Sequence, residues 1–305
     1  MGNLGFDKKV SERNIKIISW IAMLLASSLS LILWRELGGG EPFWWSFFTL
    51  CSLITVCIIT FSVKMLLPLR RFVIILLIIF MFGFGGGWQW GLIPWIRNSI
   101  IWNAWIGTMP WALSSLLTHF LRLSPAIAIL AFLLLTNRKF KDFFLVKGDI
   151  RAPVEPSKLI GMKEPKPWTK IGSIFTIIFT LGTLIFLLIS RIPTITDFIR
   201  VLPLLPVSVL IAAINAFNEE FSLRAAPLSE LWSFIGKKQG LLITTIYFGL
   251  GHFYGVPNGL IGVALSAYLG FFIGKSLLET KGFFWAWTIH FFPDVIIFTF
   301  YAMFP

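Results

Sequence analysis

The stretch IGSIFTIIFTLGTLIFLLIS, residues 171–190, is the clearest structural signal in the sequence. It contains no charged residue and no proline, and most of its side chains are aliphatic or aromatic. A helix needs about 20 consecutive apolar residues to cross the hydrocarbon core of a bilayer. The stretch therefore predicts a helix that crosses a membrane.

The rest of the chain has the same character. Of its 305 residues, 57% are hydrophobic and only 13% are charged, and the mean hydropathy is +0.84. Because soluble domains carry about 25% charged residues, a soluble enzyme, a disordered chain and a fibrous protein are excluded. We predict an all-α, polytopic transmembrane bundle of about eight to nine spans. The predicted spans are 17–34, 43–63, 72–93, 104–136, 171–190, 198–231, 240–256, 259–278 and 283–303.

The net charge of +12 predicts an orientation in the membrane. The basic residues lie between the spans rather than in one patch, which favours contact with membrane lipid and argues against a nucleic-acid partner. With the N-terminus in the cytoplasm, most of the 26 Lys and Arg residues fall on inner segments, as the positive-inside rule requires. We therefore expect an integral, multi-pass protein with a cytoplasmic N-terminus, in a prokaryotic cell membrane.

One polar segment divides the chain. Residues 137–170 contain four prolines and many charged residues, which is typical of an extended cytoplasmic linker with little secondary structure. The linker separates N-terminal transmembrane helices, residues 1–136, from a C-terminal core, residues 171–305. The two halves do not repeat each other, which disfavours a transporter built from duplicated units. No motif in residues 1–136 indicates their role.

The C-terminal core contains a tight set of six ionisable residues inside predicted spans. They are Glu219, Glu220, Arg224, His252, His290 and Asp294. Each charged group costs several kcal/mol at mid-bilayer unless it faces a polar interior, so each is a functional candidate. Glu220 and Arg224 are four residues apart, which predicts an ion pair on one helix face. His290 and Asp294 share a face for the same reason. Glu219 points about 100° away from Glu220, and we expect the ion pair to leave it free.

A cluster of Glu, His, His and Asp supports two chemistries, and both activate water. In the first, a carboxylate acts as a general base on water, one histidine assists it, and the other groups stabilise the oxyanion. In the second, Glu219, His252, His290 and Asp294 bind a divalent metal such as Zn²⁺, which lowers the pKa of bound water. Hydrolysis is the reaction that either arrangement favours, and a peptide bond is the natural target for a protein embedded in a membrane.

Three short motifs around these residues resemble a known family. Residues 219–224, EEFSLR, read as EExxxR, residues 248–252, FGLGH, as FxxxH, and residues 290–294, HFFPD, as HxxxD. In this order they look like the signatures of the CPBP intramembrane proteases, the CAAX proteases and bacteriocin-processing enzymes also called the Abi family. The motifs cover about 76 residues. The resemblance implies a helical protease core over residues 171–305.

The resemblance also implies a role for each motif residue. Glu219, with His252, would activate the water, while Glu220 and Arg224 would hold the helix and the base in place. His290 and Asp294 would form the oxyanion site. A carboxylate is a poor oxyanion donor unless it is protonated, so Asp294 keeps the zinc hypothesis open. We favour the metal-free glutamate mechanism, with no cofactor and Zn²⁺ as the alternative.

The substrate is expected to be a membrane-associated protein or peptide. Two other functions remain as alternatives, namely a non-catalytic immunity or scaffold protein of the same fold and an ion-coupled transporter. His119 and Arg122 lie in the fourth predicted span and could form a proton-relay pair. We expect instead that His119 faces protein or lipid headgroups, because a lone histidine near a helix end more often does so.

Overall fold

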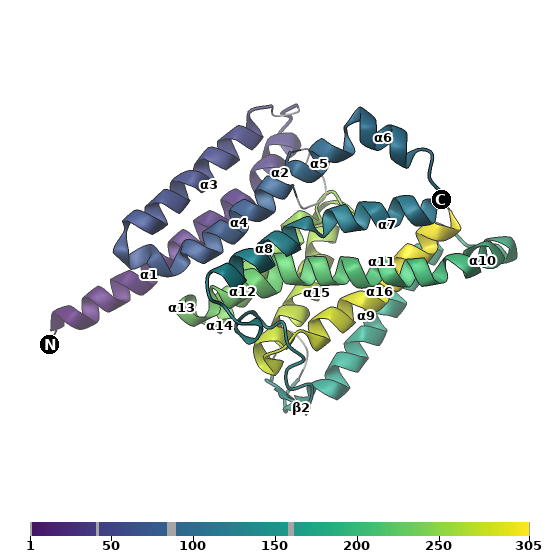
Figure 1. Cartoon of the computed structure of the whole chain (residues 1–305). Helices are drawn as coiled ribbons and strands as arrows, with labels where there is room; N and C mark the ends of the chain where they lie inside the picture. Colours follow the sequence, from purple (N-terminus) through teal and green to yellow (C-terminus); the bar gives the residue numbers. More distant parts are fainter. Residues whose placement is uncertain (1, 41–42, 84–89, 158–161, 305) are drawn as a thin grey trace.

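The structure is a computed structural model that describes residues 2–40, 43–83, 90–157 and 162–304. In these residues the chain is mostly helical, and its strands are limited to one pair of two-residue segments. Figure 1 shows long helices packed side by side, with α7 running beside α11. The all-α bundle predicted from the sequence is therefore confirmed.

In the described residues, eight α-helices precede the polar segment. They are α1 Gly2–Ala26, α2 Leu29–Glu36, α3 Trp45–Ser62, α4 Arg70–Phe82, α5 Leu92–Arg97, α6 Ile100–Ile106, α7 Trp111–Arg122 and α8 Ser124–Leu135. The axes of α1 and α2 meet at an angle of 55° at Ser27 and Ser28. Pro125 lies in the first turn of α8, where a proline is tolerated because the backbone N–H groups of that turn have no intrahelical acceptor.

The C-terminal half contains the remaining helices. They are α9 Trp168–Ser190, α10 Ile195–Val201, α11 Leu205–Glu220, α12 Ala226–Ser229, α13 Trp232–Ile235, α14 Lys237–Gly251, α15 Gly259–Thr280 and α16 Phe284–Met303. A π-helical turn, Phe221–Ala225, joins α11 to α12. Helices α11 and α9 both pack against α16, and α14 packs against α15. These contacts form the frame of the C-terminal half.

The described residues contain seven helical segments that are long and apolar enough to cross a membrane, or eight if bent α1 and α2 form one span. The predicted span at 240–256 corresponds to α14, which has only 15 residues and ends at Gly251. Part of the predicted span at 72–93, residues 84–89, lies outside the described residues. The polytopic architecture thus agrees with the sequence, and α14 is shorter than expected.

The described residues of this polar segment, 137–157 and 162–170, contain little secondary structure and pack on the bundle. Strands β1, Pro153–Val154, and β2, Lys166–Pro167, form one antiparallel pair. The side chains of Phe143 and Trp168 are fully buried, and the Trp168 indole donates a hydrogen bond to Glu279 of α15 at 2.8 Å. The sequence did not indicate that Phe143 and Trp168 are buried, because polar residues and prolines surround them.

Segments rich in basic residues meet at one end of the bundle. Buried Glu230, just after α12, accepts a hydrogen bond from Arg138 at 2.8 Å and lies 3.6 Å from Arg71. The Lys281 ammonium lies over the ring of Trp232, 4.0 Å from its centroid. Positive charge that gathers at one end is the arrangement on which the expected orientation depends.

The packing of α9 on α16 requires a glycine at position 172. A Cβ atom there would collide with the indole of Trp285. We expect Gly172→Ala to lower the free energy of unfolding by about 1–3 kcal/mol, because overpacking forces neighbouring groups apart. Gly182→Ala on the same helix is the control, because a Cβ there meets no atom within 4 Å. Thermal unfolding in detergent compares the two variants, and equal stability would contradict the close contact.

Candidate active site

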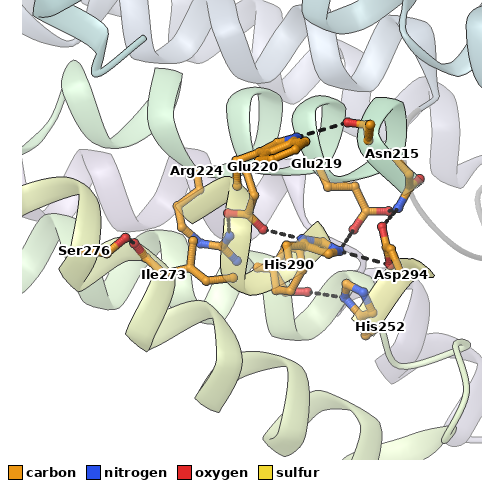
Figure 2. Close-up of polar contacts among 12 residues, drawn as sticks. Asn215, Glu219, Glu220, Arg224, His252, Ile273, Ser276, His290 and Asp294 are labelled. Carbon is orange, nitrogen blue, oxygen red and sulfur yellow. Dashed lines mark hydrogen bonds and ion pairs between the residues drawn. The ribbon is translucent and has the colours of Figure 1, made fainter. Parts of the chain in front are cut away.

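The six candidate residues come from three helices that meet in the C-terminal half. Glu219 and Glu220 end α11, and Arg224 follows in the π-helical turn. Single π-helical turns occur often at functional sites because they shift the register of the side chains that follow. His252 comes immediately after α14, while His290 and Asp294 are one turn apart on α16. Figure 2 shows the side chains of Glu219, His290 and Asp294 pointing toward one another.

Glu220 and Arg224 form the fully buried ion pair that their spacing predicts, and both side chains are 0% exposed. The Arg224 guanidinium also lies over the ring of Phe248, 4.2 Å from its centroid. Helix α15 makes room for it with Gly270, where a Cβ would lie 2.9 Å from Nη2 of Arg224. A buried charge requires a partner, so this pair fixes α11 against α14 and α15.

His290 connects the buried pair to the other carboxylates. Its Nδ1 lies 2.6 Å from Oε1 of Glu220. Because an ionised carboxylate only accepts hydrogen bonds, the proton of this bond belongs to Nδ1. Nε2 on the other side of the ring lies 3.5 Å from Oδ1 of Asp294 and 3.8 Å from Oε2 of Glu219. The imidazole therefore has a carboxylate on both sides.

Glu219 is held by groups that the sequence did not connect with it. Its Oε1 lies 3.2 Å from Nδ2 of Asn215 and 3.5 Å from Nη2 of Arg122. The side chain is 12% exposed. The expectation that Glu219 is free is therefore wrong. Asn215 reaches it from one turn earlier on α11, and Arg122 reaches it from α7, which is distant in the sequence.

Asn215 also holds Asp294. Its Nδ2 donates a hydrogen bond to Oδ2 of Asp294 at 2.9 Å, so one amide group joins two carboxylates on different helices. The sequence analysis did not select Asn215. The available signal was its position four residues before Glu219, which places both side chains on one helix face.

His252 reaches the site by a different route. Its Nδ1 donates a hydrogen bond to the backbone carbonyl of Phe248 at 2.9 Å, and the two rings are in contact, with centroids 4.4 Å apart. Because a carbonyl only accepts, neutral His252 carries its proton on Nδ1 and can take up a second one on Nε2. Among the described contacts, no hydrogen bond or ion pair joins His252 to the other five candidates. His252 is associated with Glu219, His290 and Asp294 through the cavity that these four residues line.

This cavity has a volume of about 880 Å³ and an open mouth. Glu219, His252, His290 and Asp294 form its polar wall together with Asn215 and Arg122, and Glu220 and Arg224 lie behind that wall. Most of the remaining lining is apolar and comes from α9, α15 and α16, with Phe179, Leu265 and Ile297 among the lining residues. Ser27 and Ser28, at the break between α1 and α2, also line it.

The structure describes no direct hydrogen bond between His119 and Arg122. His119 is buried, its Nδ1 donates a hydrogen bond to the carbonyl of Ser115 at 2.8 Å, and its ring meets the ring of Phe298 edge-on. It faces protein, as expected. Arg122 instead extends toward Glu219 in the polar wall.

The four residues named as candidate zinc ligands have suitable donor atoms, because carboxylates and imidazoles both bind zinc. Among the residues that the structure describes, however, no three His, Cys, Asp or Glu side chains are arranged to hold a metal ion. Nδ1 of His290 is also engaged by Glu220. The side chains as placed do not fit a metal ion, so no reaction step is derived through one.

The site combines carboxylates, imidazoles and an apolar cavity within a helical membrane protein. A comparison of the sequence with known protein families agrees with such a site. Residues 201–296 match the family described as Type II CAAX prenyl endopeptidase Rce1-like. The match includes all six candidate residues, and it confirms the resemblance to the CPBP, or CAAX protease, family. The match covers this part of the chain alone, and it supports an intramembrane endopeptidase in general. No curated protein and no solved structure matches the chain.

Proposed function

We propose that the protein hydrolyses a peptide bond of a membrane-associated protein or peptide, using a water activated by Glu219 and His252. The observation that carries this proposal is the position of Glu219, His290 and Asp294 in one wall of a large, mostly apolar cavity. An apolar cavity accommodates a hydrophobic segment, and the polar wall supplies groups that move protons.

Glu219 is the general base in this mechanism. Asn215 and Arg122 both contact its Oε1, while Oε2 lies 3.8 Å from His290, beyond direct hydrogen-bond range. Oε2 is therefore the oxygen that takes a proton from the attacking water. The water oxygen then bonds to the carbonyl carbon of the substrate, and the π electrons of the C=O bond move to its oxygen.

His290 stabilises the resulting oxyanion. Its Nδ1 donates to Glu220, and in the imidazolium form its Nε2 carries a second proton that can be donated. The nearby carboxylates favour that form because they place negative charge beside the ring. Asp294 accepts a hydrogen bond from Asn215. In this proposal Asp294 acts as an orienting acceptor, and His290 supplies the donor.

The tetrahedral intermediate collapses when the C–N bond breaks. The bonding electrons go to the nitrogen, which takes up a proton, and the new acid and amine leave. Protonated Glu219 is one source of this proton. His252 is the other, because its Nε2 can exchange a proton while Nδ1 stays bound to the Phe248 carbonyl.

The proposal is tested by comparing protein termini in membranes of cells that express the wild type or Glu219→Ala. Specific new termini that appear only with the wild type would show proteolysis and would identify the substrates. Matching profiles at equal expression would contradict the proposal. A transporter would then be tested by uptake that depends on Glu219 and His252, whereas an immunity or scaffold protein would tolerate loss of both.

Metal content provides a separate prediction. Protein purified without chelator should contain well under one Zn²⁺ per chain, and incubation with a chelator should leave cleavage unchanged. The reason is that Nδ1 of His290 is bound to Glu220, and Nδ2 of Asn215 contacts both Glu219 and Asp294. Elemental analysis checks this. One zinc per chain in the wild type, lost in His252→Ala, would instead establish the metal-dependent mechanism.

A further inference from the structure

Arg122 belongs to the N-terminal half, yet it is part of the polar wall. It is the last residue of α7, and its Nη2 lies 3.5 Å from Oε1 of Glu219. It lies outside the matched residues 201–296 and outside the predicted core, residues 171–305. Its side chain is 31% exposed and lines the cavity. The end of α7 thus contributes a cation to a site otherwise built by α11, α14 and α16.

The backbone of Arg122 has its own attachment. Nδ2 of Asn218, which is almost fully buried, donates a hydrogen bond to the Arg122 carbonyl oxygen at 2.7 Å. This bond fixes the end of α7 against α11 without using the guanidinium. A substitution at position 122 changes the side chain and leaves the backbone carbonyl in place. It can therefore remove the charge while it keeps the hydrogen bond from Asn218.

The negative charges of the site explain what the Arg122 guanidinium contributes. The site contains three carboxylates, those of Glu219, Glu220 and Asp294, and Arg224 pairs with only one of them. A carboxylate in a largely buried site needs a compensating charge or hydrogen bonds to remain ionised. Arg122 supplies positive charge beside Glu219, and a general base must be ionised to accept a proton.

We propose that Arg122 is a positioning residue, and that the N-terminal half thereby completes the active site. By holding Oε1, Arg122 keeps Glu219 ionised and turns Oε2 toward the substrate water. This inference rests on the proposed endopeptidase function. It gives residues 1–136 a role that their sequence did not reveal.

The test uses the full chain in detergent and a quenched fluorescent peptide that spans the cleavage site found by the comparison of termini. Arg122→Met keeps an unbranched, flexible side chain and removes its charge. We expect kcat to fall by up to about 100-fold, because a misplaced catalytic group loses that much. KM should change less than about twofold and the melting temperature should be unchanged, because the Asn218 bond remains. Arg70→Met is the control, since it removes an exposed cation at the start of α4.

Two further measurements separate positioning from a merely structural role. Added guanidinium should raise the activity of Arg122→Ala in a concentration-dependent manner, because the cavity is open to small cations. It should not raise the activity of Glu219→Gln, which has no carboxylate to hold. Arg122→Met should cause no additional loss in a Glu219→Gln background, since Arg122 acts through that carboxylate.

The outcomes distinguish this inference from the proposed function. If Glu219→Gln is inactive while Arg122→Met retains full kcat, the inference is wrong and the endopeptidase function stands. If Glu219→Gln cleaves like the wild type, both are wrong. A loss confined to KM would overturn the positioning role in favour of substrate binding. Should Arg122→Met fail to fold, Arg122→Ala decides. A rise in its activity with added guanidinium would support the positioning role, and a folded Arg122→Ala protein that shows no such rise would overturn it.

Discussion

Glu219→Gln should lower the kcat of cleavage by about 10²- to 10⁴-fold, the range that general-base catalysis contributes. The substitution keeps the size of the side chain and removes the oxygen that accepts the proton. The amide can still meet Asn215 through its carbonyl oxygen, so the site should remain folded. Turnover of a peptide that spans the identified cleavage site measures the effect, with circular dichroism and thermal unfolding as measures of fold.

Glu36→Gln is the matched control, because Glu36 is exposed at the end of α2. It should cleave like the wild type. A Glu219→Gln protein that is folded and retains more than about one tenth of wild-type kcat would rule out Glu219 as the base. His252→Ala would then become the more informative variant, because Nε2 of His252 is the other group in the cavity wall that can accept a proton from water.

The bundle could be predicted from the sequence because membrane crossing depends on a local property. A run of apolar residues such as 171–190 needs no knowledge of its neighbours to be recognised. The exception is α14, which has 15 residues. Its apolar run continues past Gly251, but the helix ends there. Hydropathy along the sequence does not show where a helix ends.

The site was predictable only where its residues share a helix. The spacing of Glu220 and Arg224 indicates their ion pair, and the motifs select the other candidates. Contacts between helices were not accessible in this way. Arg122 comes within 3.5 Å of Glu219 across a separation of 97 residues, and no local pattern encodes that approach. Glu219 was expected to have no partner because only the residues of its own helix, α11, could be considered.

Polar residues that are not ionisable were also overlooked. Asn215 donates to both Glu219 and Asp294, and Asn218 donates to the Arg122 carbonyl. An amide in an apolar helix costs less than a charge, so it stands out less in the sequence. A buried amide must nevertheless form hydrogen bonds. Here its partners are the carboxylates of Glu219 and Asp294 and the backbone carbonyl of Arg122 at the end of α7.

Breaking the buried pair should have the largest effect on stability. Arg224→Met removes the cation beside Glu220, and both side chains are 0% exposed. Removal of one partner from a buried pair costs about 3–5 kcal/mol, because the other charge stays buried and uncompensated. Unfolding in detergent should show this loss. Lys237→Met is the control, since Lys237 forms an exposed pair with Glu155 at 3.4 Å, and such pairs contribute at most about 1 kcal/mol.

The double variant Glu220→Gln with Arg224→Met sharpens this prediction. It removes both charges, so most of the lost stability should return, as with other buried pairs replaced by neutral side chains. Activity should not return, because Nδ1 of His290 loses the carboxylate that it meets at 2.6 Å and with it the field that favours a protonated ring. A double variant as unstable as the two single losses added together would show that the groups do not act as a pair. A stable and fully active double variant would show that the oxyanion donor does not depend on Glu220.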